Sequence, residues 1–178
     1  TSFFSCSNAR GARSGESSPF CVNFPTYSFS AGDAAGMPDA NSHEFDPESS
    51  APVICRGDEP FKKGGHTTSL KKGTKLRSVY GSDEIRMRHR HRYEFNNDYR
   101  DMFTGLGLVL GGTSPGDALV ESVEVPDNLF HLGVQYHPEF KSRPANPHPL
   151  FREFVAASLE NRRRSGKNIL IAEGEEKK

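Results

Sequence analysis

A histidine and a glutamate two residues apart close a short apolar run at residues 133–140, which read Gly-Val-Gln-Tyr-His-Pro-Glu-Phe. Residues i and i+2 leaving a strand point to the same side, so Glu139 can accept the proton of one ring nitrogen of His137. Pro138 restricts His137 to extended conformations. The other ring nitrogen stays available for acid/base chemistry, and a cysteine thiol facing it would complete a Cys-His-Glu triad. The same tripeptide also fits a polar turn after an edge strand.

A second stretch, at residues 88–92, reads Arg-His-Arg-His-Arg, as expected of a strand with one face toward a polar cleft. The alternation places three guanidinium groups, from Arg88 to Arg92, on one face and the imidazoles of His89 and His91 on the other. The cationic face suits a phosphate group, and it equally suits a hydrated strand edge. His89 and His91 lack a third ligand at zinc spacing, so the sequence predicts no metal site.

The elements that must position these residues are readable after residue 36. Asn96 or Asn97 is expected to cap a short helix that stops at Gly105, and Lys-Lys-Gly-Gly at 62–65 predicts an exposed turn. Apolar runs predict strands at 51–55, 106–110, 119–125 and 131–136, and the alternation of side chains predicts a strand at 88–95. Apolar residues at helical spacing predict a final helix, namely Leu150, Phe151, Phe154, Val155 and Leu159.

The chain divides into three parts by composition. Residues 1–35 are rich in Ser, Gly and Ala without a helical or strand period, which predicts a disordered or aberrant segment. Residues 36–160 carry the periodic patterns and are expected to fold. Residues 161–178 are mostly charged and predict a flexible tail.

Composition excludes several classes of function. Lys plus Arg equals Asp plus Glu at 23 each, so no overall field favours nucleic acid or an anionic membrane as a partner. No apolar run approaches the roughly 20 residues that span a bilayer. The three cysteines include no C-x-x-C pair, which favours a reducing, cytoplasmic setting over a disulfide framework. Neither a G-x-G-x-x-G nor a phosphate-binding G-x-x-x-x-G-K-[ST] loop occurs, so no nucleotide cofactor site is predicted in this chain.

Three separated motifs, at 39–46, 88–96 and 137–157, occur in the order that they have in class I glutamine amidotransferases. Together they resemble this family, and more narrowly the glutaminase domain of the CTP synthases, from residue 36 to residue 159. The resemblance implies an α/β, flavodoxin-like fold with a central, mostly parallel sheet flanked by helices. The part present would be incomplete at its N-terminal side.

The resemblance also implies roles for individual residues. His137 would move protons and Glu139 would orient it. Arg92 would bind the α-carboxylate of glutamine through its planar fork, and Glu44 would bind the α-ammonium group. On its sequence alone, Glu44 is also compatible with an ordinary acidic loop position.

The nucleophile is where the sequence departs from the family. The resemblance places it beside Cys21, but residues 19–23 read Pro-Phe-Cys-Val-Asn, without the glycines of a G-x-C-x-G elbow. One hypothesis is a glutaminase part that supplies ammonia for ATP-dependent amination of UTP to CTP. The alternative is a non-catalytic remnant that folds or associates with full-length CTP synthase. A related amide or γ-glutamyl hydrolase fits residues 88–94 and 141–144 less well.

The remaining expectations concern partners. Glutamine is the ligand expected for this chain itself. ATP, Mg²⁺ and UTP would belong to a synthase domain N-terminal to Thr1, and the full-length protein is expected to be a cytoplasmic homo-oligomer.

Overall fold

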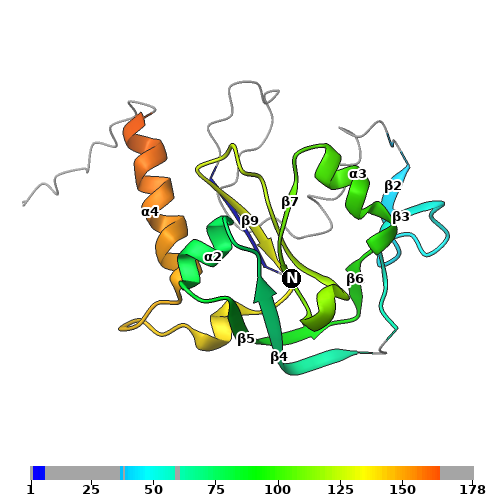
Figure 1. Cartoon of the computed structure of the whole chain (residues 1–178), viewed down its shortest axis with the longest axis horizontal. Helices are drawn as coiled ribbons and strands as arrows, with labels where there is room; N and C mark the ends of the chain where they lie inside the picture. Colours follow the sequence, from blue (N-terminus) through cyan, green and yellow to red (C-terminus); the bar gives the residue numbers. More distant parts are fainter. Residues whose placement is uncertain (1, 7–36, 38, 59–60, 165–178) are drawn as a thin grey trace, which may run out of the picture.

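A six-stranded sheet lies at the centre of the fold, in the strand order β1-β9-β8-β7-β4-β5. The structure is a computed structural model that describes residues 2–6, 37, 39–58 and 61–164 (Figure 1). The strands of this sheet are β1 (Ser2–Cys6), β4 (Lys62–Leu70), β5 (Glu84–His91), β7 (Val109–Thr113), β8 (Val120–Glu124) and β9 (Phe130–Val134). A separate three-stranded sheet has the order β2 (Ala40–Ser42), β3 (Ala51–Arg56), β6 (Tyr93–Phe95).

Strand direction corrects one expectation. Every described pair of the six-stranded sheet is antiparallel, and only β2 and β3 pair in parallel. The prediction of a mostly parallel sheet was therefore wrong for the described strands. The reason lies in the connections, because residues 114–119 and 125–129 are too short for the crossover that parallel neighbours need.

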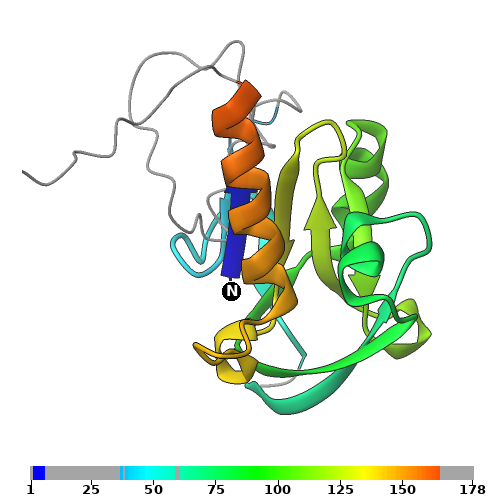
Figure 2. The ribbon, with the colours of Figure 1, turned by 90° about the vertical axis from the view of Figure 1, so that its left-hand side faces the viewer.

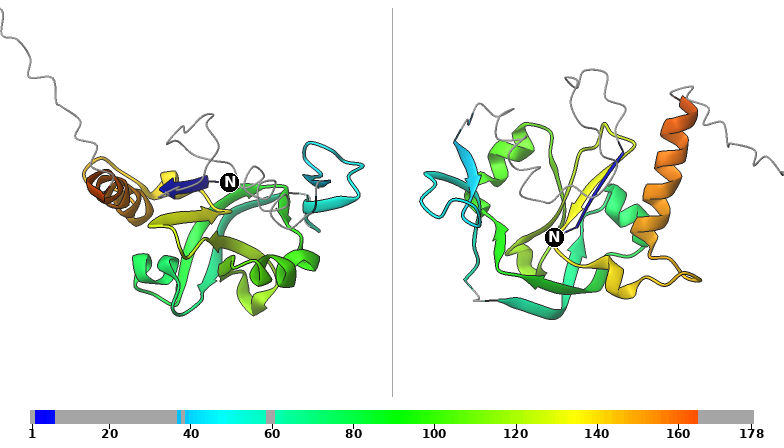
Figure 3. Two further views of the ribbon diagram at one scale, coloured as in Figure 1. Left: turned by 90° about the horizontal axis from the view of Figure 1, so that it is seen from above. Right: turned by 180° about the vertical axis from the view of Figure 1, so that it is seen from behind.

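The helices in the described part of the chain are short except for the last. They are α2 (Lys75–Tyr80), α3 (Arg100–Gly105) and α4 (Pro149–Arg164), with single 3₁₀ turns η1 (Asn97–Tyr99), η2 (Pro115–Asp117) and η3 (Pro138–Lys141). Asn96 caps η1 by accepting the Asp98 N–H, and α3 ends at Gly105, as the sequence predicts. Figures 2 and 3 show α4 standing alongside the strands, on the far side of the molecule from β2 and β3.

Two local expectations differ from the structure. Residues 62–65 belong to β4 and not to an exposed turn, and the Lys62 side chain is buried. A carboxylate 59 residues away neutralises this lysine, which no local pattern reveals. Helix α4 continues to Arg164, so the first residues of the predicted tail are helical. Glu160 pairs with Arg164 one turn on, which supports this last turn.

The core consists of two clusters of buried side chains. One joins the three-stranded sheet to α3 and β8, and its members include Val53, Ile54, Phe95, Phe103 and Val123. The other packs β9 against α2 and α4, and its members include Leu76, Leu132, Val134, Tyr136 and Leu150. Tyr136 is fully buried in the second cluster, so the residue that follows it leaves the sheet from a fixed point. The predicted division at residues 35 and 160 stays a prediction, because residues 7–36 and 165–178 lie outside the described part. Within the two outer segments, residues 2–6 form β1 and residues 161–164 belong to α4.

Candidate active site

His137 and Glu139 form the pair that their spacing predicts. His137 precedes η3 in an extended conformation, and its Nδ1 lies 2.6 Å from Glu139 Oε1. Because a carboxylate only accepts, Nδ1 carries the proton of this bond. His137 Nε2 is buried and has no hydrogen-bond partner in the described part of the chain. In the neutral ring this atom therefore holds a lone pair, the state that a general base needs.

The main chain of His137 is held by neighbouring elements. Its N–H donates to the Arg88 carbonyl oxygen at 2.9 Å. One residue earlier, the Tyr136 hydroxyl lies 3.1 Å from the Tyr80 hydroxyl, which also contacts His148 Nε2 at 3.4 Å. Burial lowers the pKa of His148 to about 4 and raises the pKa of Tyr136 well above its ordinary value, so both side chains are neutral at pH 7.

The strip of arginines and histidines lies along β5 and continues toward β6. Arg88 and Arg90 are exposed, whereas His89 and His91 are buried on the opposite face, as the alternation predicts. The guanidinium carbon of Arg88 lies 5.5 Å from the ring centre of Phe140. A hollow of about 730 Å³ opens beside these side chains, lined by Phe61, Lys63, Gly64, Arg88, His89, Arg90 and Phe140.

Glu44 and Arg92 lie at the same end of the three-stranded sheet. The His43 N–H donates to the Ile54 carbonyl oxygen at 2.9 Å, so Glu44 follows beside the end of β3. Just beyond that end, the Gly57 N–H donates to the Arg92 carbonyl oxygen at 3.1 Å. Both side chains are exposed. Their roles toward an amino acid head group stay predictions.

The two predicted halves of the site are set apart along one segment. Arg92 is four positions after Arg88, whose carbonyl oxygen accepts the His137 N–H, and four positions correspond to roughly 13 Å of extended chain. Figure 1 draws η3 and the loop after β2 on opposite sides of the molecule. Among the described residues, no hydrogen bond or ion pair joins Glu44 or Arg92 to the His137–Glu139 pair.

The predicted nucleophile, Cys21, lies outside the described residues. The thiol that is described belongs to Cys55 on β3, opposite Glu94. Burial and the nearby carboxylate of Glu94 raise the pKa of this thiol, which disfavours the thiolate. Cys55 therefore does not have the surroundings of a reactive cysteine.

A buried group beneath β5 was missed by the motif search. Glu121 Oε1 lies 2.8 Å from Lys62 Nζ, and Oε2 accepts the Thr68 hydroxyl and faces His89 Nε2 at 3.9 Å. His89 Nδ1 in turn lies 3.1 Å from His91 Nε2. We call these five residues the Glu121 cluster. The available signal was a glutamate inside the apolar run 119–125. Within the described residues, no group of three metal-ligating side chains occurs.

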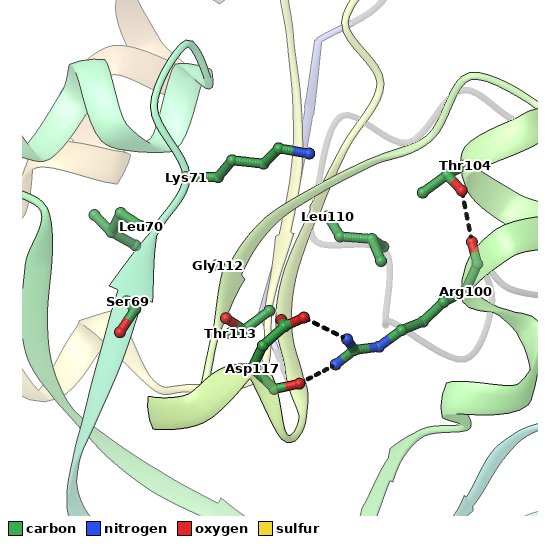
Figure 4. A pocket seen from close by; sticks show the side chains of 9 residues that line it. All are labelled: Ser69, Leu70, Lys71, Arg100, Thr104, Leu110, Gly112, Thr113 and Asp117. Carbon is green, nitrogen blue, oxygen red and sulfur yellow. Dashed lines mark hydrogen bonds and ion pairs between the residues drawn. The ribbon is translucent and has the colours of Figure 1, made fainter.

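A second hollow, of about 410 Å³, lies between β4, β7 and α3 (Figure 4). Its most prominent cation is Arg100, which is already bonded: Nη1 to Asp117 Oδ2 at 3.1 Å, Nη2 to the Asp117 carbonyl oxygen at 3.0 Å, and Nε to Asn97 Oδ1 at 2.9 Å. These bonds hold the turn at η2. They occupy Nε and both Nη atoms of Arg100, so the guanidinium has no free pair of N–H groups for a bidentate bond to a ligand. None of the predicted site residues lines this hollow.

Comparison with known proteins gives a consistent result. CTP synthase from Carboxydothermus hydrogenoformans is 49% identical over 138 residues, which cover 72% of this chain and 26% of the relative. CTP synthase from Aquifex aeolicus is 46% identical over 138 residues with the same two coverages. The chain thus spans about a quarter of the length of these curated relatives. No described helix is long and apolar enough to cross a membrane.

A solved structure supports the same assignment. The glutaminase domain of Trypanosoma brucei CTPS, with bound acivicin, matches with a TM-score of 0.73 and 31% identity, over 76% of this chain and 57% of that one. This likeness confirms the predicted α/β class. The family model for glutamine amidotransferase class I matches residues 40–157, which include Glu44, Arg92, His137 and Glu139. The chain therefore belongs to the class I glutamine amidotransferase family.

Proposed function

We propose that this chain carries the acid/base half of a glutamine-hydrolysing site. The observation that supports this function is the geometry of His137, whose Nδ1 is 2.6 Å from Glu139 Oε1 while Nε2 is buried without a hydrogen-bond partner. Such a nitrogen is oriented and free to exchange a proton with a thiol or with a leaving amine. An ordinary polar turn would not require a buried, unpartnered ring nitrogen.

In the proposed cycle, His137 Nε2 takes the proton of a cysteine thiol, and the thiolate attacks the side-chain carboxamide of glutamine. His137 then protonates the departing nitrogen. Ammonia is released, and the substrate's acyl group remains bound to the cysteine as a thioester. Water attacks the thioester, with His137 taking its proton, and glutamate leaves as the thiol is restored. Glu139 holds the ring throughout. Arg92 would bind the substrate's α-carboxylate and Glu44 its α-ammonium group, because their charges are opposite to those of the two groups.

The wider proposal follows from the similarity to CTP synthases. The ammonia would serve ATP-dependent amination of UTP to CTP, a step of pyrimidine nucleotide biosynthesis. UTP, ATP and Mg²⁺ would bind to a synthase domain outside this chain, in a homo-oligomeric, cytoplasmic enzyme. Nucleic acid and membranes are not proposed as partners.

One observation favours a second candidate, a non-catalytic remnant that associates with full-length CTP synthase. The free thiol of Cys55, on β3 opposite Glu94, has a raised pKa, so it does not replace a missing nucleophile. The proposed activity therefore assigns the nucleophile to Cys21, which lacks the glycines of the family's elbow. The remnant predicts no covalent labelling by a glutamine-analogue electrophile and retained binding to the full-length enzyme.

The test is steady-state glutamine hydrolysis by the purified chain and by three variants. If the proposal holds, Cys21→Ala abolishes hydrolysis and covalent labelling, and His137→Ala lowers kcat by about 10²- to 10⁴-fold. The matched control is Cys55→Ser, which removes a thiol away from His137 and is expected to leave kcat within about twofold. Equal rates of glutamine hydrolysis in the unchanged chain and in Cys21→Ala would refute the proposed glutaminase function.

A further inference from the structure

Glu121 connects two strands that the sheet itself leaves unconnected. Strand β7 lies between β8 and β4 and pairs with β4 only at Ser69 and Leu70. Within the described residues, the part of β4 before Ser69 therefore has no backbone hydrogen bonds to a neighbouring strand on the side where β7 and β8 follow. The Glu121 side chain, 1% exposed, reaches from β8 to Lys62 and Thr68 in that part of β4. Its carboxylate thus replaces missing ladder bonds with a buried, charge-assisted link.

The same residue lies next to the main chain that carries His137. The Gln135 N–H donates to the Glu121 carbonyl oxygen at 2.9 Å, two residues before His137. The His137 N–H donates to Arg88 at 2.9 Å, and the neighbour of Arg88 on the buried face is His89, which faces the Glu121 carboxylate. Glu121 is therefore connected to His137 in two ways. Its main chain bonds to Gln135, and its side chain faces His89, the neighbour of Arg88.

Charge fixes the protonation pattern of His89. Burial lowers the pKa of His89 to about 3 and of His91 to about 4, so each ring is neutral at pH 7 and has one N–H. His89 Nε2 lies 3.9 Å from Glu121 Oε2, too far for a hydrogen bond, but a proton on this nitrogen is attracted by the carboxylate charge across the buried gap. A proton on Nδ1 would turn the Nε2 lone pair toward that carboxylate. His89 is therefore the Nε2–H tautomer, and its Nδ1 accepts from His91 Nε2–H across 3.1 Å.

We propose that Glu121 is a positioning residue for His137: its buried carboxylate fixes the tautomer of His89 and the place of β5, and β5 holds the main chain of His137. This inference rests on the proposed function, in which His137 moves the protons. It assigns a task in the site to a residue that touches no substrate.

The first test needs no substitution and no activity. Nitrogen-15 NMR of the histidine rings in the unchanged protein distinguishes the two neutral tautomers. We expect His89 protonated at Nε2 and His91 protonated at Nε2 at pH 7. A His89 ring protonated at Nδ1 would overturn the proposal.

The second test changes the carboxylate and observes the ring of His137. We expect Glu121→Gln to shift and broaden the His137 imidazole resonances at temperatures where circular dichroism shows a folded protein. The double variant Lys62→Met with Glu121→Gln removes both charges, so it avoids a buried unpaired lysine, and it is expected to displace the same resonances. Wild-type His137 resonances in a folded Glu121 variant would refute the positioning role.

A matched control is available on the same strand. Glu124 is also buried on β8, but its oxygens accept the N–H groups of Lys75 and Leu76 at the start of α2, at 2.9 and 2.8 Å. Glu124→Gln is expected to destabilise the fold without moving the His137 resonances. An equal displacement in this control would overturn the proposal, because any loss of stability would then produce the signal.

Activity is measured separately so that the two proposals fail differently. In an active protein, the Glu121 variants are expected to lower kcat at least tenfold and to change KM less than twofold. An unchanged chain that hydrolyses no glutamine refutes the proposed function, while the NMR comparison still decides the role of Glu121.

Discussion

The His137–Glu139 pair and the Glu121 cluster both adjoin β5, the first through the Arg88 carbonyl oxygen and the second through His89 and His91, and they differ in how they are built. The pair is local, with partners two residues apart, and the Glu139 side chain is 49% exposed. The cluster joins residues 59 and 53 positions apart, and its carboxylate is almost fully buried. The comparison predicts that the pair proposed for the chemistry contributes little to stability, whereas the buried cluster stabilises the fold without taking part in the chemistry itself.

The largest expected effect is on the cluster. Glu121→Ala leaves the Lys62 ammonium buried without its partner, and we expect a loss of about 3–5 kcal/mol in the free energy of unfolding. Urea unfolding at pH 7 measures it. The Lys62→Met, Glu121→Gln double variant should recover most of the loss. A stability within about 1 kcal/mol of the unchanged protein would remove the contrast between the two regions.

This contrast also explains what the sequence could predict. His137 and Glu139 are visible because a strand end with an intervening proline fixes their geometry locally, and Asn96 is visible as a cap for the same reason. Lys62 is predicted as part of an exposed turn, because its partner Glu121 is 59 residues away in sequence and the two meet only in the folded sheet. The strand directions were predicted wrongly because the family resemblance implied parallel strands. The connections 114–119 and 125–129 are short, which indicates antiparallel neighbours.

The next effect is an acid sensitivity of the buried histidines. The pKa is lowered from the ordinary 6.5 to about 3 in His89 and to about 4 in His91, His131 and His148. Below pH 6.5 these histidines bind protons in the unfolded chain but stay neutral in the folded chain. The free energy of unfolding therefore decreases as the pH drops from 6.5 toward 4. Each histidine contributes up to about 1.4 kcal/mol per pH unit within that window.

Urea unfolding at several pH values between 7 and 5 measures this slope. The variant His89→Asn with His91→Asn removes the two histidines of the cluster and should give a shallower slope, whereas His131→Asn removes a single one outside it. An unchanged slope in the double variant would mean that the cluster does not exclude protons.

The smallest effect is expected at the pair itself. Glu139→Gln removes the charge from a hydrogen bond between side chains that are 20% and 49% exposed, and we expect the free energy of unfolding to change by less than about 1 kcal/mol. Thermal or urea unfolding measures this change. A loss as large as that of Glu121→Ala would show that the pair also stabilises the fold. The predicted difference in stability contribution between the two regions would then be wrong.

The alternation along residues 88–92 limits how this stretch of the chain can change in length. Inserting or deleting one residue there would exchange the two faces, turning guanidinium groups into the core and imidazoles into water. A change of two residues would keep the faces but displace Arg92 from His137 by roughly 7 Å. Substitutions can be accommodated one at a time, but the alternation and the position of Arg92 together require a fixed number of residues in this segment.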